Sequence, residues 1–331
     1  MPGRKQKRLT VGLTYDRRSD YLALGYGEEE TAEFDRDDTI TALDTTLLSL
    51  GYATDHIGHV RNLIHRLDQG ERWDLVFNIA EGLYGVGREA LVPALLDAYR
   101  IPYVFSDPLV LAVTLHKGMT KRIIRDLGLP TPDFAVVENE TELAAVDLPF
   151  PLFVKPVAEG TGKGISEHSL VSTKDALQLV CRSIWQNFRQ PALVESYLAG
   201  REYTVGVVGT GPQARAVGVM EVTMLAGDQD EIYSYENKEF YEERVRYVPC
   251  TGPEAAAMIE LSLAVWRGLG CRDGGRVDLR CDEHGKPNFL EVNPLAGLHP
   301  RHSDLPILSG LAGLSYADLL RQIMESACER L

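Results

Sequence analysis

The sequence predicts an α/β protein, α+β overall, which begins with a parallel sheet and has more than one domain. Three observations support this fold class. Short apolar runs rich in β-branched residues alternate with segments of helical periodicity in the N-terminal third, as in a parallel sheet with crossover helices. The chain has 331 residues, which is longer than a domain with a single hydrophobic core usually is. Hydrophobic residues make up 44% and charged residues 25%, as in globular proteins.

The N-terminal third supplies the predicted parallel sheet. Its expected strands are 9–15, 52–57, 75–79 and 103–105, and its expected helices are 40–50, 63–67 and 90–99. Gly51 follows the first of these helices as a C-terminal glycine. A glycine-rich loop, 81–87, follows the third strand. We expect this unit to span residues 1–108.

The rest of the chain is expected to form two further units, 109–200 and 201–331. One long helix is expected over 109–127, because Gly128 and the prolines Pro130 and Pro132 follow it. Further strands are expected over 134–137, 153–155, 193–197, 203–209, 216–223, 275–280 and 288–292, and further helices over 173–188, 254–269 and 316–329. A polar, acidic loop is expected over 227–243, and a Pro/His-rich loop before the last helix.

Charge and cysteine content exclude several classes of protein. The formal net charge is −14, so a nucleic-acid partner is not expected, because no basic field exists to displace counterions from phosphates. The five cysteines show neither a disulfide framework nor CxxC spacing, which favours reduced thiols. We find no signal-peptide pattern and no apolar run of the roughly 20 residues that span a bilayer. We therefore expect a soluble, cytoplasmic protein without a membrane partner.

The strongest local signal lies near the C-terminus, in the two expected strands GGRVDLRC and NFLEVN. Alternation places Arg276 and Asp278 on one face of the first strand, and Glu291 and Asn293 on one face of the second. Antiparallel pairing would bring the two carboxylates and the amide together. Oxygen ligands of this kind suit Mg²⁺. Each residue alone is more simply explained as part of a solvated hairpin, but the whole set favours a metal site.

Two other segments suit a phosphate-bearing ligand. Lys155 ends an expected strand directly before the glycine-rich loop 159–164, where backbone N–H groups and an ammonium can hold phosphate oxygens. The loop is not a Walker A motif, and no GxGxxG follows the first strand. Further along, Glu195 lies on a strand that leads into a turn, and Glu202 begins the next strand. Exposed backbone groups in such a turn can form hydrogen bonds with the edge of an adenine base. Either glutamate alone is more simply interpreted as a surface acid.

The order of six segments resembles the ATP-grasp superfamily, and most closely the D-alanine–D-alanine ligases, from about residue 75 to the C-terminus. These segments are HKGMTK, PLFVKPVAEGTGKGIS, ALVESYLAGREYTV, SYENKEF, GGRVDLR and NFLEVNPLAGL. The resemblance implies a three-domain ATP-grasp architecture with a Rossmann-like N-terminal domain and ATP between the other two domains. It implies an ATP-dependent ligase that phosphorylates a carboxylate and lets an amine attack the acylphosphate. It further implies small amino-acid substrates and a homodimer formed through the first domain.

The resemblance also implies roles for individual residues. Arg276 would stabilise the tetrahedral intermediate, and Lys238 would close over the phosphates. Mg²⁺ or Mn²⁺ would be held by Asp278, Glu291 and Asn293. ATP would be contacted by Lys117, Lys155, Glu159, Gly160, Thr161, Gly162, Glu195, Tyr197, Leu198, Glu202 and Lys238.

The sequence departs from the family pattern where the substrates would bind. The family's N-terminal Glu, which orients the first substrate's amine, is missing, and Glu33 or Asp37 are candidates to replace it. Glu81-Gly82 stands where the family has His-Gly, and Lys238-Glu239 stands where it has Lys-Tyr. The substrate-carboxylate loop reads 297–303, from Gly297 to Ser303, so that either Ser303 or Arg301 is expected to bind a carboxylate. His299 and His302 in this loop are explained equally well by simple loop polarity.

Two functions from different classes fit these observations. The first is an active ligase that joins D-alanine to D-alanine, or another pair of amino acids or small carboxylates and amines. The second is a nucleotide-binding or scaffolding homologue that has lost catalysis. The joint presence of Lys155, Arg276 and the three expected metal ligands favours the first, because an inactive homologue has no chemical reason to keep them together.

Overall fold

The computed structural model describes residues 8–224 and 245–331, and its N-terminal part contains the expected parallel sheet. The strand order is β2-β1-β3, with both neighbours parallel to β1. The elements of this part are β1 (Thr10–Thr14), α1 (Arg18–Ala23), α2 (Asp37–Ser49), β2 (Ala53–Gly58), α3 (Val60–Asp68), β3 (Leu75–Asn78), the short 3₁₀ helix η1 (Arg88–Ala90) and α4 (Leu91–Tyr99).

A four-stranded antiparallel sheet forms the central part, in the order β4-β7-β5-β6. Its elements are β4 (Phe134–Val137), α7 (Glu140–Ala144), β5 (Leu152–Pro156), η2 (Glu167–Ser169), β6 (Leu170–Val171), α8 (Lys174–Phe188) and β7 (Ala192–Ser196). Helix α8 covers one face of the sheet, and its buried residues Leu177, Cys181 and Ile184 pack on Val154 and Val194 of the strands.

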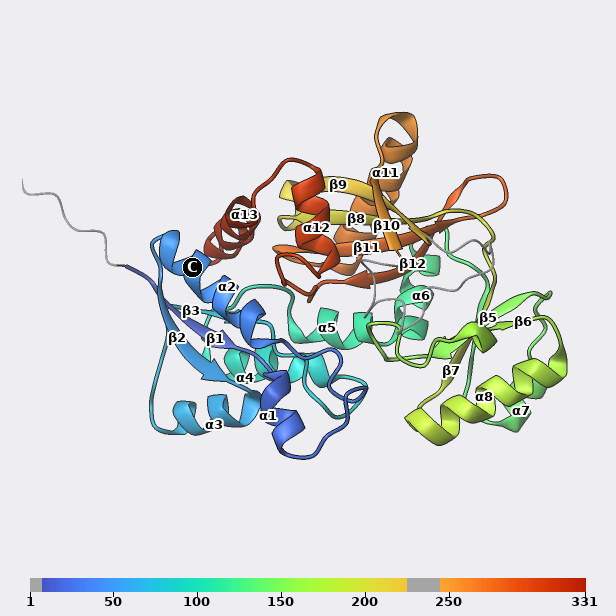
Figure 1. The fold of residues 1–331 in the computed structure, drawn as a ribbon, viewed down its shortest axis with the longest axis horizontal. Helices are drawn as coiled ribbons and strands as arrows, with labels where there is room; N and C mark the ends of the chain where they lie inside the picture. The colour runs from blue at the N-terminus through green and yellow to red at the C-terminus, as the bar shows by residue number, and fades with distance from the viewer. Residues whose placement is uncertain (1–7, 225–244) are drawn as a thin grey trace, which may run out of the picture.

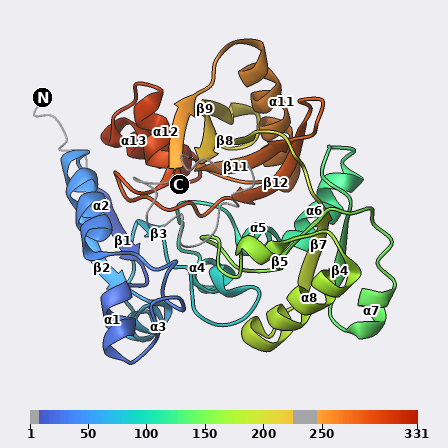
Figure 2. The ribbon, with the colours of Figure 1, turned by 45° about the vertical axis from the view of Figure 1, so that its right-hand side comes forward.

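The C-terminal part is a five-stranded antiparallel sheet in the order β10-β9-β8-β11-β12. Its elements are β8 (Glu202–Val208), η3 (Gly211–Gln213), β9 (Arg215–Met224), β10 (Val245–Pro249), α11 (Gly252–Leu269), β11 (Gly274–Cys281), β12 (Pro287–Asn293), α12 (Asp304–Leu311) and α13 (Tyr316–Cys328). This sheet lies across the other two parts, with the N-terminal part beneath one end and the central part beneath the other (Figures 1 and 2).

The C-terminal helix returns to the N-terminal part of the fold. Leu319, Leu320 and Ile323 of α13 are fully buried in one core with Val11 and Phe77 of the parallel sheet. The ends of the chain therefore share a hydrophobic core, and separating them exposes apolar surface at a cost of about 25 cal/mol per Å². The predicted domain boundaries stay predictions, and α13 packs on both the N-terminal part and the C-terminal sheet.

The single helix expected over 109–127 is wrong: the structure has two helices, α5 (Pro108–Leu115) and α6 (Lys117–Asp126). His116 interrupts them with φ −86° and ψ 88°, and its ring nitrogen Nδ1 accepts from the backbone N–H of Met119 at 3.2 Å. A side-chain N-cap of this kind favours a new helix start. The break has a consequence for the site, because it makes Lys117 the first residue of α6.

Other differences from the sequence expectations are local. The strand expected over 103–105 is reduced to an isolated bridge between Val76 and Tyr103, because Phe105 takes a positive φ of 77° that no strand continues through. Helix α12 occupies the end of the expected Pro/His-rich loop. The short elements α1, α7, β6 and β10 were also not expected. The loop expected over 227–243 lies outside the described residues.

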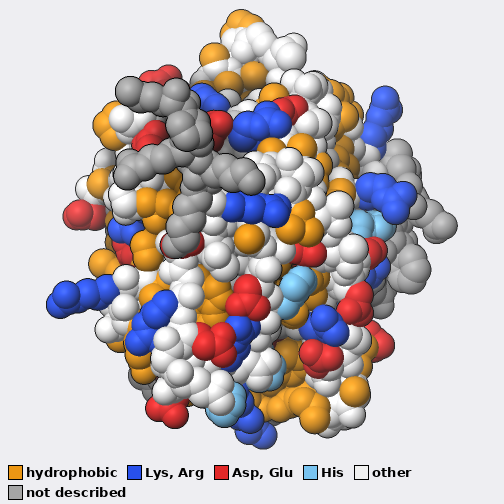
Figure 3. Space-filling view, turned by 90° about the vertical axis from the view of Figure 1, so that its left-hand side faces the viewer, with side chains coloured by type: hydrophobic (Ala, Val, Ile, Leu, Met, Phe, Trp, Pro, Cys, Tyr) orange, Lys and Arg blue, Asp and Glu red, His pale blue; other side chains and the backbone are white. Residues whose placement is uncertain are grey.

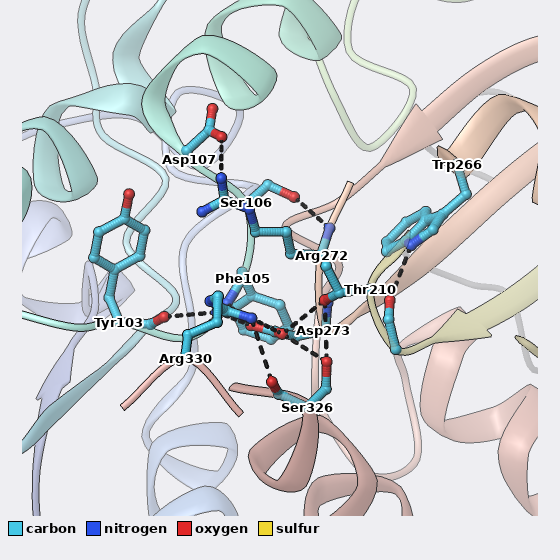
Figure 4. A network of polar contacts seen from close by, with 11 residues as sticks. Tyr103, Phe105, Ser106, Asp107, Thr210, Trp266, Arg272, Asp273, Ser326 and Arg330 are labelled. Atoms are coloured by element: carbon cyan, nitrogen blue, oxygen red, sulfur yellow. Dashed lines mark hydrogen bonds and ion pairs between the residues drawn. The ribbon is translucent and has the colours of Figure 1, made fainter. Parts of the chain in front are cut away.

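A buried ionic cluster fastens the N-terminal part to the C-terminal sheet (Figure 4). Asp273, which is 0% exposed, accepts from the backbone N–H of Phe105 at 2.7 Å and from Arg330 at 2.5 and 2.7 Å. Arg330 also donates to the carbonyl of Tyr103 at 3.0 Å, and Ser326 donates to Asp273 at 2.9 Å. The carboxylate of Asp273 therefore links three segments that are distant in sequence.

We predict that Asp273→Asn lowers the free energy of unfolding by about 2 kcal/mol, because one partner of a largely buried ion pair is removed. Asparagine tolerates the positive φ of 63° at this position, so the backbone is retained. The measurement is urea unfolding followed by tryptophan fluorescence. Asp126→Asn, at an exposed helix end, is the control and should change stability by less than about 0.5 kcal/mol. An equal, small change in both variants would contradict the anchoring role.

Charged side chains lie on the surface, and the thiols are reduced, as the cysteine spacing indicated. On the face that carries α2, α3 and β2, acidic and basic side chains are interspersed (Figure 3). All five cysteines are free thiols. Within residues 8–224 and 245–331, no helix has the length and apolar character needed to cross a membrane.

Candidate active site

Two adjoining cavities lie where the three parts of the fold meet. The first, which we call the inter-sheet cavity, lies between the central and C-terminal sheets. Its wall includes Lys117, Lys155, Glu159, Gly160, Thr161, Gly162, Glu195, Tyr197, Leu198, Glu202, Arg276, Asp278, Arg280 and Glu291. The second, the N-terminal cavity, is lined by Glu33, Asp35, Arg36, Glu81, Glu89, Asn293, Gly297, His299, His302 and Ser303, among others. Lys117, Glu159–Thr161 and Arg276 border both cavities, so a group at this junction is within reach of both.

A buried ionic chain supports the floor of the inter-sheet cavity. Glu195 of β7 is 3% exposed and lies 2.9 Å from Nζ of Lys121 and 2.8 Å from Nζ of Lys155. Burial opposes ionisation of Glu195, but the two lysines outweigh burial and lower the pKa of its carboxyl to about 2. Burial also lowers the pKa of Lys121 to about 8. Glu195 therefore positions Lys155 at the cavity wall.

The glycine loop that follows β5 is held in place from both sides. Nζ of Lys117 donates to the carbonyl of Glu159 at 2.5 Å, and the backbone N–H of Gly160 donates to Glu33 at 2.6 Å. Gly162 and Gly164 have φ of 74°, and a Cβ on Gly164 would lie 2.4 Å from Pro156. Thr161 takes φ 49°, and its hydroxyl is buried without a hydrogen-bond partner in the described chain. An unsatisfied buried hydroxyl in a glycine-rich loop suits a ligand with acceptor oxygens.

The predicted oxygen-ligand cluster is formed as the strand alternation indicated. Strands β11 and β12 are antiparallel, with Asp278 opposite Glu291 and Arg276 opposite Asn293. The amide of Asn293 donates to Asp278 at 3.2 Å and to Glu291 at 3.4 Å, and Arg276 pairs directly with Asp278. Lys117 lies 3.4 Å from Glu291. Two carboxylates and an amide, neutralised by two cations, form a donor set that fits Mg²⁺ once the amide turns its oxygen inward.

Arg276 is the residue best placed to act on both cavities. Its guanidinium contacts Asp278 and lies 3.6 Å from Asp304 at the start of α12. These carboxylates outweigh the effect of burial, and the pKa of Arg276 stays above its usual range. A fixed, buried cation at the junction is suited to stabilise negative charge that develops during a reaction.

The far end of the inter-sheet cavity contains the turn that follows β7. The hydroxyl of Tyr197 accepts from Arg280 at 3.1 Å, and Arg280 also lies 3.4 Å from Glu202. Leu198 lines the same end. The strand ends at Ser196, and the backbone N–H of Tyr197 still donates to the carbonyl of Pro151 at 3.2 Å, which fixes the turn beside the cavity.

The N-terminal cavity is closed by the loop before α12. The backbone N–H of His299 donates to the hydroxyl of Ser303 at 2.9 Å, and the ring of His299 lies 3.0 Å from Asp38. Gly297 permits this fold of the loop, because a Cβ there would lie 2.8 Å from the Ser303 hydroxyl. His299 therefore holds the loop in place, and this structural role accounts for a polar residue at this position.

Of the two acids considered as replacements for the missing N-terminal glutamate, only Glu33 lines the cavity. Its carboxylate is already engaged, at 2.7 Å from Arg88 and 2.6 Å from the Gly160 N–H. Asp37 lies on α2, 64% exposed, and pairs with Arg17 at 3.3 Å. Two acids that were not singled out, Asp35 and Glu89, line the same cavity.

Burial in the N-terminal cavity raises the pKa of Glu89 to about 8, with Arg88 opposing and Glu33 adding to the rise. The folded protein therefore binds this proton more tightly than the unfolded chain does. We predict that wild-type stability falls, through this group, as pH rises from about 4.5 to about 8. Glu89→Gln should be more stable than wild type at pH 9 and equal to it below pH 4.5, as measured by thermal unfolding. A stability difference independent of pH would contradict the assignment.

The structure brings together most of the residues singled out from the sequence. All the residues expected to contact ATP that are described line the inter-sheet cavity, and Glu81, Gly297 and Ser303 line the N-terminal one. Arg301 is exposed and lines neither cavity. Lys238 lies outside the described residues. Lys121 was not singled out, although it follows Lys117 by four residues on the same helix and so shares its face.

The fold and this pair of cavities are those of an ATP-grasp ligase. Comparison with known proteins shows which family of these ligases the chain belongs to. A model of the D-ala D-ala ligase C-terminus matches residues 123–325. The D-alanine–D-alanine ligase of Bordetella petrii is 34% identical over 279 residues, covering 80% of this chain and 82% of that protein. The uncharacterized protein y4sG of Sinorhizobium fredii is 36% identical and covers 77% of this chain and 75% of its own length.

Solved structures share the fold. The D-alanine–D-alanine ligase of Bacillus anthracis complexed with ATP has a TM-score of 0.74 at 22% identity, with 98% of each chain covered. The VanG D-Ala:D-Ser ligase of Enterococcus faecalis has a TM-score of 0.75 at 18% identity, with 97% of this chain and all of that chain covered. The chain belongs to the D-alanine–D-alanine ligase family, whose members are ATP-dependent amino-acid ligases.

Proposed function

We propose that this protein joins two small amino acids through an acylphosphate, with ATP in the inter-sheet cavity and the amino acids in the N-terminal cavity. The observation that carries the proposal is the junction of the two cavities. There Arg276, Asp278 and Glu291 lie on paired strands beside Lys117 and the glycine loop. The solved B. anthracis relative is described as complexed with ATP, and the VanG relative as a D-Ala:D-Ser ligase, which supports both halves of the proposal.

In this reaction the residues of the chain would bind, orient and neutralise. Lys155 and Lys117 would hold phosphate oxygens, with the backbone N–H groups of the glycine loop around them. The carboxylate of one amino acid attacks the terminal phosphate of ATP, and ADP leaves. The amine of the second attacks the acylphosphate and phosphate leaves, forming the C–N bond.

Arg276 would neutralise the oxyanion of the tetrahedral intermediate that forms in the second step. Asp278, Glu291 and Asn293 would hold Mg²⁺ or Mn²⁺, which offsets the charge of the phosphate oxygens when bound. Lys238, which lies outside the described residues, is proposed from the family pattern to close over the phosphates. Water must be excluded while the acylphosphate exists, because water would hydrolyse it.

The test is release of ADP from ATP and Mg²⁺ with a panel of D- and L-amino acids. Release that requires an amino acid, together with a new product joined by an amide, supports the proposal. Tight ATP binding without turnover for any pair would overturn it and would favour the alternative, a nucleotide-binding homologue that has lost catalysis.

We expect the loop 297–303 to bind the carboxylate of the acceptor amino acid, and two residues compete for this role. Arg301→Ala should mainly raise the KM for the acceptor if the guanidinium of Arg301 binds the acceptor carboxylate through two hydrogen bonds. Ser303→Ala should do so if the hydroxyl at the cavity wall is the ligand. Because Arg301 is exposed and outside the cavity wall, we expect the larger rise, about tenfold, for Ser303→Ala. Steady-state kinetics with varied acceptor decide between them, and a rise confined to Arg301→Ala would reverse the assignment.

The family resemblance also leads us to propose a cytoplasmic homodimer formed through the first domain. Sedimentation velocity at micromolar concentration would test the assembly. A species of 36.7 kDa alone would contradict the dimer.

A further inference from the structure

Three carboxylates line the N-terminal cavity without any partner in the described chain. Asp35 lies between α1 and α2, Glu81 follows β3, and Glu89 lies in η1. Their side chains make no hydrogen bond and no ion pair with residues 8–224 or 245–331. The cavity opens beyond the carboxyl ends of β1 and β3, the edge of a parallel sheet where ligands bind.

Arg36 and Arg276 line the cavity beside these acids, and Arg276 is engaged by Asp278 and Asp304. Three further cations near the cavity are also engaged. Arg88 pairs with Glu33 at 2.7 Å and donates to the carbonyl of Ala158 at 2.9 Å. Lys117 donates to the Glu159 carbonyl and lies 3.4 Å from Glu291. His299 is paired with Asp38. Neither Arg88 nor Lys117 can neutralise the three acids without giving up contacts that hold the glycine loop and the metal cluster.

Holding the loops together does not explain the three acids. Another carboxylate at the same end of the sheet does that: Asp16 accepts from the backbone N–H of Gly82 at 2.8 Å and from the hydroxyl of Tyr21 at 2.5 Å. Glu81, next to Gly82, makes no such contact within the described chain. Burial raises the pKa of Glu81 and of Asp35 well above the usual range of carboxyl groups, so the residues around them disfavour their ionised forms. Groups kept at such a cost are typical of functional sites.

We propose that the N-terminal cavity takes an amino acid that carries a second cationic group besides its α-ammonium, such as a diamino acid. This inference rests on the proposed ligase function and names its substrate class. The α-ammonium of any amino acid can neutralise one carboxylate. A neutral side chain leaves the other acids partly buried and unpaired, whereas a second ammonium pairs with them and offsets the desolvation cost.

The first experiment compares substrates of matched shape. Ornithine and lysine, in both enantiomers, are compared with norvaline and norleucine, which have unbranched apolar side chains of similar length. ADP release with saturating ATP and Mg²⁺ is measured against amino-acid concentration. We expect kcat/KM for the better diamino acid to exceed that of the apolar analogue by at least about 100-fold, because a polar site rejects an analogue that lacks the matching group.

The second experiment tests the carboxylates themselves. Glu81→Gln and Glu89→Gln should each raise the KM for the diamino acid at least about tenfold and raise the KM for norleucine by clearly less, because norleucine has only its α-ammonium to pair with the carboxylates. Glu29→Gln, an exposed acid between α1 and α2, is the matched control and should change neither KM. Equal losses for both substrates in the cavity variants would indicate a purely structural role and overturn the inference.

The outcomes separate this inference from the function on which it rests. Turnover with alanine, serine or norleucine that equals or exceeds turnover with the diamino acids would overturn the inference and leave the ligase assignment intact. Failure of every amino acid to promote ADP release would overturn the ligase assignment, and this inference with it.

Discussion

Replacing Glu291 with Gln should lower the rate of ADP release at saturating substrates by at least about 100-fold while leaving the fold intact. Glu291 faces Asp278 across β11 and β12, contacts Asn293 at 3.4 Å and lies 3.4 Å from Lys117. An amide keeps the shape of the side chain and removes the charge that binds a divalent cation. Loss of a group that stabilises charge in a transition state typically costs about 10²- to 10³-fold in kcat.

The matched control for this variant is Glu283→Gln, in the exposed turn that joins the same two strands, where the carboxylate is 79% exposed. It should turn over at the wild-type rate. The circular dichroism spectrum and melting temperature should be near wild type for both variants. A Glu291→Gln enzyme with a near-normal rate, and with the same dependence on Mg²⁺ concentration as wild type, would show that the metal assignment is wrong.

Replacing Glu195 with Gln should lower the free energy of unfolding by about 3 kcal/mol and weaken ATP binding. The side chains of Lys121 and Lys155 are 0% and 7% exposed, and Glu195 is the carboxylate between them. Removing the shared partner of a buried ion pair leaves uncompensated charge, which typically costs about 3–5 kcal/mol. Because the pKa of Glu195 is lowered to about 2, its contribution is complete above about pH 4.5 and is lost as pH falls towards 2.

Urea unfolding at pH 7 measures the loss, and ATP titration by calorimetry measures the affinity. The control is Glu140→Gln, which breaks an ion pair with Arg182 at 2.5 Å between side chains 51% and 46% exposed, and should leave the stability close to that of the wild type because solvent screens this pair. Lys121→Met combined with Glu195→Gln should recover part of the stability, because one buried ammonium is then removed. Equal losses in Glu195→Gln and Glu140→Gln would contradict the buried chain.

The parts of the fold that could be predicted are those set by local periodicity. Alternation of two residues in β11 and β12 was enough to place Asp278, Glu291 and Asn293 together, because a strand has only two faces and the hairpin turn fixes the pairing. The parallel sheet was predicted in the same way from buried apolar runs between helices. Element ends were less secure, since the cap at His116, which divides α5 from α6, depends on one side chain turning back onto the backbone.

The parts of the site that could not be predicted depend on tertiary contacts between distant segments. Asp35 and Glu89 are 54 positions apart, and nothing local indicates that they face one cavity. Lys121 is indistinguishable in sequence from an exposed helical lysine, and only its burial against Glu195 shows that it is structural. Arg301 stays a prediction as a carboxylate ligand: its side chain is exposed and lines neither cavity, and the sequence alone does not tell which way a loop residue faces.

The most direct test of the ligase assignment is mass spectrometry of the products formed from ATP, Mg²⁺ and a mixed pool of D- and L-amino acids, with ADP and phosphate quantified in the same reaction. The assignment predicts one ADP and one phosphate for each product molecule, and a product whose mass is the sum of two amino acids less one water. ATP binding without any such product, or ADP release that does not depend on amino acids, would contradict it.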